Sequence, residues 1–329
     1  MSPIELSNDA DELLSDARTL VVIARKADLG EAWLLDHLPA TIRPWLARLA
    51  DEARPARSGA ATSTLLPEGG PRRLVVISLF DSVSRHLSEA RSYEITSNLR
   101  GAPGSDEGTT AVLVGLADPS HAFGAALGVA RAFPLFGRKS PRADDDSTDQ
   151  VVRIGLCSAA GWLTEDLEGL AHAADTLREV QRLVDTPAAE LTTAAFEAEA
   201  RSACEKLAHV SVTSLVGDDL YNAGLHGLHA VGRTAMIPPR LIVLDYNPPG
   251  ATDTVALVGK GIVYDTGGLS LKIVGDRMLT MKCDMGGAAA TLGAFVLLAK
   301  RGVSRRVVAA LGVAENAIGP DSYRPDDIL

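Results

Sequence analysis

Short apolar runs alternate with segments of helical periodicity along the first half of the chain. The runs are rich in Val, Leu and Ile, which favour buried strands. Between them, residues 42–53 place Trp45, Leu46 and Leu49 on one helical face, and residues 121–133 form an alanine-rich helical pattern. This alternation predicts an α/β domain, with strands at 20–24, 74–80, 111–116 and 151–156.

A long helical pattern at 163–184 separates this region from a second set of apolar runs. Thr164 is its predicted N-cap, and Pro187 follows its end, where proline stops a helix. We therefore predict an N-terminal α/β domain at 1–163, a linking helix at 164–184 and a C-terminal α/β domain at 185–329. The second domain should have a mixed, mainly parallel sheet flanked by helices, with strands at 210–215, 241–244, 255–258 and 307–311 and helices at 192–207 and 286–300.

The composition limits the class of protein. With 46% hydrophobic and 22% charged residues, the 329-residue chain can fill the core of one or two globular domains. Its net charge of −10 argues against general nucleic-acid binding, which needs a basic surface. The three cysteines lie far apart and show neither a disulfide framework nor zinc-site spacing, which favours a reducing interior.

No export or membrane segment is predicted. The N-terminus is acidic and lacks the basic region that opens a secretory signal. The longest uncharged apolar run, 288–299, is too short to span a bilayer. We therefore expect a soluble, cytoplasmic protein.

Charged residues follow two apolar runs in the second half of the chain. The run at 255–258 is predicted to be a buried strand that stops at Gly259, directly before Lys260. The run at 262–264 ends at Asp265. Charged groups beside glycines at the ends of buried strands are where α/β proteins build sites.

Two further residues, Lys272 and Asp284, complete this charged set. A pair of glycines follows each of the two aspartates, and glycine lets backbone approach a ligand or metal closely. Paired carboxylates suit divalent cations such as Mn²⁺, Mg²⁺ or Zn²⁺. The other interpretation is a set of ordinary ion pairs, which the residue types alone favour.

Other candidate motifs are weaker. A phosphate loop at 259–260 is excluded, because Thr254 stands where that loop needs a glycine. His226 and His229 lie in a glycine-rich segment predicted to be a turn, where packing is a better interpretation than a metal pair. The acidic segment 137–149 is predicted to be a solvated surface loop.

Two blocks of this region match a known family. Residues 258–272 read Val-Gly-Lys-Gly-Ile-Val-Tyr-Asp-Thr-Gly-Gly-Leu-Ser-Leu-Lys, and residues 281–290 read Met-Lys-Cys-Asp-Met-Gly-Gly-Ala-Ala-Ala. Both blocks resemble the leucyl aminopeptidase family, the cytosolic two-metal exopeptidases. A weaker resemblance extends to 183–187, 315–316 and 323–326, so it covers roughly the second half of the chain.

The resemblance implies a metallo-aminopeptidase that holds two divalent metal ions, Mn²⁺ or Zn²⁺, side by side. Lys260, Asp265 and Asp284 would be metal ligands, with Asp265 bridging both ions and Lys260 binding as a buried, neutral amine. Lys272 would stay protonated and stabilise the oxyanion that forms when a metal-activated water attacks the peptide bond. The implied reaction is hydrolysis of N-terminal residues from peptides.

The resemblance also implies partners. Peptides would be the substrates, and the chain would assemble as a homo-oligomer, a hexamer in this family. Leu269, Met278 and Met281 are candidates for the pocket that takes an apolar substrate side chain, although such residues are more often plain core.

One family motif is not found. The signature Asn-Thr-Asp-Ala-Glu-Gly-Arg, which supplies further Asp and Glu ligands and an arginine in the family, does not occur among the 329 residues. We therefore interpret 185–329 as the N-terminal part of an incomplete catalytic domain in a truncated or partial family member, which alone is expected to be weak or inactive. The alternative is a non-catalytic protein, a regulatory subunit or scaffold that keeps the fold.

Overall fold

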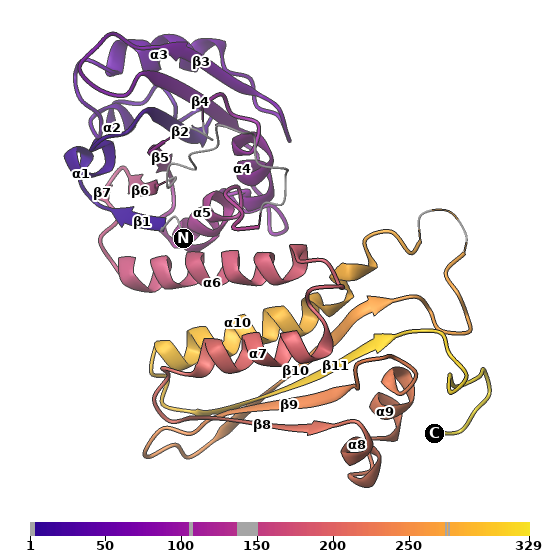
Figure 1. Ribbon diagram of the computed structural model, residues 1–329. Helices are drawn as coiled ribbons and strands as arrows, with labels where there is room; N and C mark the ends of the chain where they lie inside the picture. Colours follow the sequence, from indigo (N-terminus) through magenta and orange to yellow (C-terminus); the bar gives the residue numbers. More distant parts are fainter. Residues whose placement is uncertain (1–3, 105–107, 137–150, 274, 276) are drawn as a thin grey trace. The chain divides into compact units, whose positions relative to one another are not determined.

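A computed structural model of the chain describes residues 4–104, 108–136, 151–273, 275 and 277–329 (Figure 1). The chain divides into two compact units, Met1–Arg178 and Glu179–Leu329. The division falls inside helix α6 (Leu167–Asp185), within the segment where the sequence predicts a linking helix. The predicted acidic loop at 137–149 lies outside the described residues.

Strands and helices alternate in the first unit, as the sequence predicts. Its elements are β1 (Ile4–Ser7), α1 (Ala10–Leu14), β2 (Thr19–Arg25), α2 (Ala32–Leu35), α3 (Arg43–Glu52), β3 (Ala61–Leu65), β4 (Arg73–Leu79), α4 (Ser92–Leu99), β5 (Thr110–Gly115), η1 (Pro119–His121), α5 (Ala122–Ala130), β6 (Val152–Ser158), β7 (Gly161–Trp162) and the first part of α6.

These elements form three layers around one sheet. The strand order is β1-β6-β5-β2-β4-β3, with β7 paired to β6. Among the described strands of this unit, only β3 and β7 pair antiparallel to their neighbours. Val21 and Ile23 of β2 pack into the core beneath α4 and α5, whereas Leu20 and Val22 pack into the core beneath α1, α2 and α3. Burial on both faces explains why the parallel strands are continuous apolar runs in the sequence.

The first unit differs from the prediction at its edges and at its last helix. The short strands β1, β3 and β7 were not predicted, because none contains a long apolar run. Helix α6 begins at Leu167 and not at residue 163, so Thr164 is not its cap. Asp166 has φ 53°, a left-handed conformation that interrupts a helix directly before Leu167.

The second unit contains α7 (Thr193–Cys204), β8 (Val210–Val216), α8 (Asp218–Asn222), α9 (His226–Gly232), β9 (Arg240–Tyr246), β10 (Thr254–Asp265), η2 (Met281–Met285), α10 (Gly286–Lys300) and β11 (Arg306–Asn316). Its strands form a mixed sheet with helices on both faces: α7 and α10 cover one face, and α9 packs on the other, where Leu228 lies against Gly312 of β11. The strand order is β10-β11-β9-β8. Strands β10 and β11 pair parallel, whereas β11 with β9 and β9 with β8 pair antiparallel. Most of the parallel pairs described in the chain therefore belong to the first sheet. Helices α7 and α10 bury Phe196 and Phe295 against β9 and β11. The α/β class and the mixed, helix-flanked sheet are as predicted.

Strand β10 corrects the prediction of a short, buried strand at 255–258. It runs without a break from Thr254 to Asp265, and Gly259 is inside it. The side chain of Val258 is 82% exposed. The reason is position: β10 lies at one end of the described strand order, and alternate residues of its first half point away from the helices.

A buried carboxylate fastens α7 to the sheet. Glu197 of α7 accepts hydrogen bonds from Arg240 of β9, from Ser214 of β8 at 2.7 Å and from Arg201 of α7 at 2.7 Å. Burial raises the pKa of Glu197, but the hydrogen bonds from Ser214, Arg201 and Arg240 outweigh it and leave the pKa below its usual range. Glu197 is therefore a charged group that depends on its partners.

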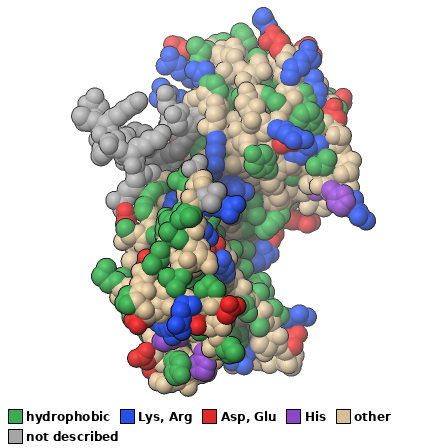
Figure 2. Space-filling model, turned by 90° about the vertical axis from the view of Figure 1, so that its right-hand side faces the viewer, with side chains coloured by type: hydrophobic (Ala, Val, Ile, Leu, Met, Phe, Trp, Pro, Cys, Tyr) green, Lys and Arg blue, Asp and Glu red, His purple; other side chains and the backbone are tan. Residues whose placement is uncertain are grey.

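Figure 2 shows one face of the molecule, where Lys, Arg, Asp and Glu side chains are interspersed with apolar ones. One helical stretch, Met281–Lys300, is long and apolar enough to cross a membrane by length and composition. Core helices meet the same criterion, and Ala288, Leu292 and Phe295 of this stretch are buried in the core of the second unit. We therefore describe it as a core helix.

Candidate active site

The four charged residues singled out in the sequence lie on three neighbouring segments. Lys260 is inside β10, and Asp265 is the last residue of the same strand. Lys272 lies in the segment that follows, and Asp284 lies in the short helix η2, directly before α10. The structure pairs them as Lys260 with Asp284 and Lys272 with Asp265.

Lys260 and Asp284 form a partly exposed ion pair. Lys260 Nζ lies 2.7 Å from Asp284 Oδ2, and the lysine side chain is 60% exposed. The burial expected for a neutral, metal-binding Lys260 is therefore not seen. Asp284 Oδ2 is buried and makes this ion pair, but no hydrogen bond of good geometry. A buried carboxylate oxygen without a hydrogen bond is available to a cation.

Glycine allows α10 to approach β10 closely enough to form this pair. A Cβ atom on Gly259 would lie 2.6 Å from Cα of Ala288 and 3.0 Å from the carbonyl oxygen of Gly287. Real Cβ atoms do not come so close to backbone. The glycine marks the contact between strand and helix, and η2, directly before α10, places Asp284 beside Lys260.

Gly259→Ala should destabilise the second unit by about 1–3 kcal/mol, because the new methyl group has to push the backbone of α10 away. Thermal melting of both variants should show this against Gly227→Ala in α9. No atom lies within 4 Å of a Cβ at Gly227, so the same change should stabilise its helix by about 0.5–1 kcal/mol. Equal melting temperatures for Gly259→Ala and wild type would contradict the close packing.

Asp265 is held by three donors. Its Oδ2 accepts from Lys272 Nζ at 2.6 Å, and its Oδ1 accepts from the Gly267 amide at 2.9 Å and from Asn316 Nδ2 at 2.9 Å. Burial raises the pKa of Asp265, but hydrogen bonds from Lys272, Gly267 and Asn316 outweigh it and lower the pKa below its usual range. Asp265 is therefore ionised at neutral pH.

Asn316 was not singled out from the sequence as a site residue. It ends β11 and stands directly opposite Asp265 in the parallel register. The only sequence signal was its place in the weak matching block at 315–316. Its contact with Asp265 follows from strand pairing, which the sequence pattern does not fix to one residue.

Of the three residues proposed for a substrate pocket, Leu269, Met278 and Met281, one contacts the charged set. Met281 Sδ is 3.2 Å from Lys272 Nζ. The Met278 carbonyl accepts a hydrogen bond from the Tyr264 hydroxyl at 3.4 Å, and Leu269 is 48% exposed. Met281 therefore contacts the charged set, while the other two remain candidates.

His226 and His229 lie on helix α9, which corrects the predicted turn. Tyr221 stacks on His226 at 4.6 Å between ring centroids, and His229 Nε2 lies 3.3 Å from Asp218 Oδ1. Among the residues that the structure describes, no three His, Cys, Asp or Glu side chains are grouped to hold a metal ion. The two histidines are packing residues here.

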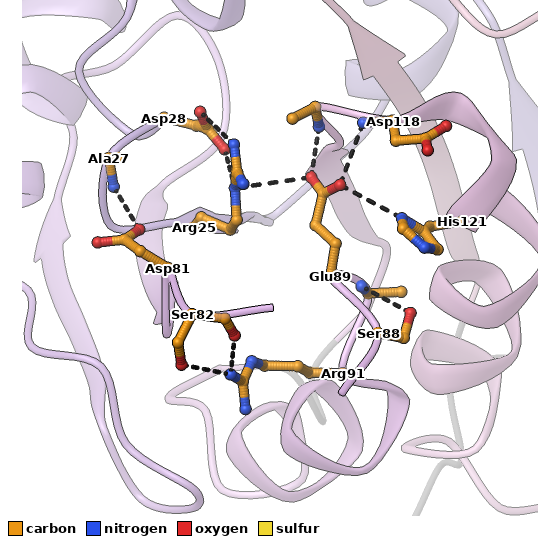
Figure 3. Close-up of polar contacts among 12 residues, drawn as sticks. Arg25, Ala27, Asp28, Asp81, Ser82, Ser88, Glu89, Arg91, Asp118 and His121 are labelled. Carbon is orange, nitrogen blue, oxygen red and sulfur yellow. Dashed lines mark hydrogen bonds and ion pairs between the residues drawn. The ribbon is translucent and has the colours of Figure 1, made fainter. Parts of the chain in front are cut away.

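A second polar cluster lies in the first unit, where strands β2 and β5 end (Figure 3). Glu89 is buried and accepts from the backbone amides of Ala117 and Asp118, the latter at 3.1 Å. Its carboxylate also lies 3.3 Å from His121 Nδ1 and 3.7 Å from Arg25 Nε. Because these partners come from the end of β2 and from the segment that follows β5, Glu89 ties the two together.

The sequence of the second unit matches a known protein family. Residues 178–329 match the family described as "Cytosol aminopeptidase family, catalytic domain". The human protein "Probable aminopeptidase NPEPL1" is 39% identical over 251 residues, which cover 75% of this chain and 47% of that protein. The chain thus spans about half the length of the curated relatives it matches.

Solved structures agree over nearly the whole chain. The apo leucyl aminopeptidase from Trypanosoma cruzi is 31% identical with a TM-score of 0.85, covering 98% of this chain and 64% of that one. The bottromycin maturation enzyme BotP in complex with Mn is 28% identical with a TM-score of 0.66, covering 94% and 62%. From its sequence matches and its fold, the chain belongs to the leucyl aminopeptidase family.

Proposed function

We propose that this chain carries part of the active site of a metallo-aminopeptidase that hydrolyses N-terminal residues from peptides. The observation that carries the proposal is the pairing of Asp265 with Lys272 and of Asp284 with Lys260, in the segment that matches the family's catalytic domain. Two carboxylates and two amines, carried by β10 and the segments that follow it, are the groups that metal-assisted hydrolysis uses.

The donor set fits a divalent cation. Asp284 Oδ2 is buried without a hydrogen bond, and Asp265 Oδ2 has Lys272 as its partner. Carboxylate oxygens suit Mn²⁺ and Zn²⁺. Asp265, Asp284 and Lys260 would hold the metal, the lysine only after losing its proton, because an ammonium has no lone pair to offer. When bound, the ions lower the pKa of a water molecule and polarise the scissile carbonyl.

Lys272 has a separate role in this proposal. Its side chain is 27% exposed and its ammonium lies 2.6 Å from Asp265 Oδ2, so it is a positive charge at the edge of the carboxylate set. A cation held there would stabilise negative charge that develops on the carbonyl oxygen during hydrolysis. Lys272 would therefore bind the reacting group, whereas Asp265 would bind metal.

The alternative is a non-catalytic member of the family. It is favoured by one observation: each of the two carboxylates is already paired with a lysine, so the described cluster has no excess negative charge. The signature Asn-Thr-Asp-Ala-Glu-Gly-Arg is also not among the 329 residues, so its ligands would have to come from elsewhere. A regulatory or scaffold role would need neither metal nor substrate.

The direct test is release of leucine from leucyl p-nitroanilide with MnCl₂ present. The 329-residue chain alone should release little, because one bound ion with an incomplete shell lacks the second Lewis acid. Fusion to a relative's segment that carries the signature should raise the rate by at least about 10²-fold. A fused protein that folds and binds Mn²⁺ but stays inactive would favour the non-catalytic alternative.

Other features of the family stay predictions for this chain. They are peptide substrates, two metal ions of the Mn²⁺ or Zn²⁺ type, assembly as a homo-hexamer and a cytoplasmic location. The relatives described as cytosol aminopeptidases support the location.

A further inference from the structure

Asn316 and Asp265 face each other across two parallel strands. Asp265 is paired with Asn316 in the register of β10 and β11, and Asn316 Nδ2 lies 2.9 Å from Asp265 Oδ1. The amide must donate in this contact, because an ionised carboxylate can only accept. The bond therefore depends on the side-chain amide of residue 316.

This contact distinguishes the two oxygens of Asp265. Oδ1 accepts two neutral donors, Asn316 Nδ2 and the Gly267 amide, each at 2.9 Å. Among the residues that the structure describes, Oδ2 accepts a hydrogen bond only from the charged Lys272. With Oδ1 occupied from two directions, the carboxylate cannot rotate without breaking a bond, and Oδ2 stays on the side of the charged residues.

We propose that Asn316 is a positioning residue, which holds Asp265 so that Oδ2 is the oxygen offered to a metal ion; this inference rests on the metal site proposed above. Groups that hydrogen-bond a metal-ligating carboxylate orient it and raise the affinity for the ion. Asn316 itself does not bind the metal in this scheme.

The backbone of Asn316 makes hydrogen bonds of its own, so the role of the side chain can be tested separately from that of the backbone. Its carbonyl oxygen accepts from the Thr266 amide at 3.2 Å and from Thr266 Oγ1 at 2.5 Å. These bonds tie the turn after β10 to the end of β11, and they survive any change of the side chain at 316. Removing the amide therefore leaves the strand pairing in place.

The test is a calorimetric titration of the 329-residue chain with MnCl₂. Wild type should bind one ion weakly. Asn316→Ala should raise the dissociation constant about 10–100-fold, the usual cost of losing a group that orients a metal ligand. Asn316→Leu keeps the volume without the donor and should have the same effect, which guards against misfolding of the alanine variant.

Thr266→Val is the matched control. It removes the Oγ1 bonds of the turn, to the Asn316 carbonyl and from the Gly268 amide, but keeps the Asn316 amide on Asp265. Its melting temperature should fall at least as much as that of Asn316→Ala, while its Mn²⁺ affinity should change less than about threefold.

Each other result has a definite meaning. Equal affinity in wild type, Asn316→Ala and Asn316→Leu would overturn the positioning role and leave the proposed metal site intact. An equal loss in Thr266→Val would assign the effect to the turn and also overturn it. A wild-type chain that takes up no Mn²⁺ would remove the metal site, and the role of Asn316 with it.

Discussion

Lys272→Ala should lower kcat for leucyl p-nitroanilide about 10²–10³-fold in the fused, signature-bearing protein, and Asp265→Ala should reduce hydrolysis to background. The first loss is the usual cost of removing one donor that stabilises an oxyanion. The second is larger because Asp265 would be a ligand shared by the metal site. The two side chains touch at 2.6 Å, so a difference between the variants reports their separate roles.

Metal binding separates these roles further. Mn²⁺ affinity should survive in Lys272→Ala, because removing the ammonium frees Asp265 Oδ2, whereas Asp265→Ala should lose the ion. Lys300→Ala and Asp253→Ala are matched controls: Lys300 ends α10, and Asp253 forms an exposed ion pair with Arg305. Both should keep wild-type kcat. If Lys272→Ala lost Mn²⁺ as fully as Asp265→Ala, the oxyanion role would be wrong.

Arg240→Leu should lower the free energy of unfolding by about 3 kcal/mol, because it leaves the buried carboxylate of Glu197 without its buried partner. The side chains of Arg240 and Glu197 are only 11% and 12% exposed. Arg201 binds the same carboxylate but is 46% exposed, so Arg201→Leu should cost less than about 1 kcal/mol. The free energies of unfolding of the two variants, measured in urea, compare a buried and a more exposed partner of the Glu197 carboxylate.

The pH dependence gives a second check on Glu197. Its pKa is lowered in the folded protein, so the stability that it contributes is fully present above its unfolded pKa of about 4.3. That stability is lost as the pH falls through the folded pKa. The gap between wild type and Arg240→Leu should therefore shrink below about pH 4.3. A gap independent of pH would mean that Arg240 acts through packing alone.

The sequence predicts the interior of the first sheet better than its edges. Strands β2, β4, β5 and β6 are covered on both faces, and continuous burial leaves a continuous apolar run. Strand β3 reads Ala-Thr-Ser-Thr-Leu and is only half-buried, so hydrophobic pattern carries no signal for it. It pairs antiparallel with β4 because the chain turns back between the two strands, and this contact is not marked by any pattern within β3 itself.

Glycine misled the prediction of β10 for a physical reason. A glycine after an apolar run often ends a strand, but Gly259 stays inside β10. It is needed because the backbone of α10 comes within the space of a Cβ atom, a contact between segments far apart in the sequence. Only the folded structure shows whether a glycine serves a turn or a close approach.

The candidate site was predictable only in part. Lys260, Asp265, Lys272 and Asp284 follow from the match to a family motif, and the structure brings them together as two ion pairs. Asn316 joins them through strand register, and no local pattern marks a residue whose partner stands on another strand. The exposure of Lys260 was also unpredictable, because it depends on which strand lies at the end of the sheet.

The position of Lys260 gives it a second property, protection against aggregation. Within the part of the chain that the structure describes, β10 is an edge strand. Such a strand offers unpaired amide and carbonyl groups to any strand that approaches, and β10 adds the exposed apolar residue Val258. A charged lysine in the same strand opposes such pairing, because stacking two copies would bury its charge. Replacing Lys260 with alanine thus removes a metal-site candidate and a solubilising charge together, whereas Asp284→Ala changes the same ion pair and leaves the edge charged.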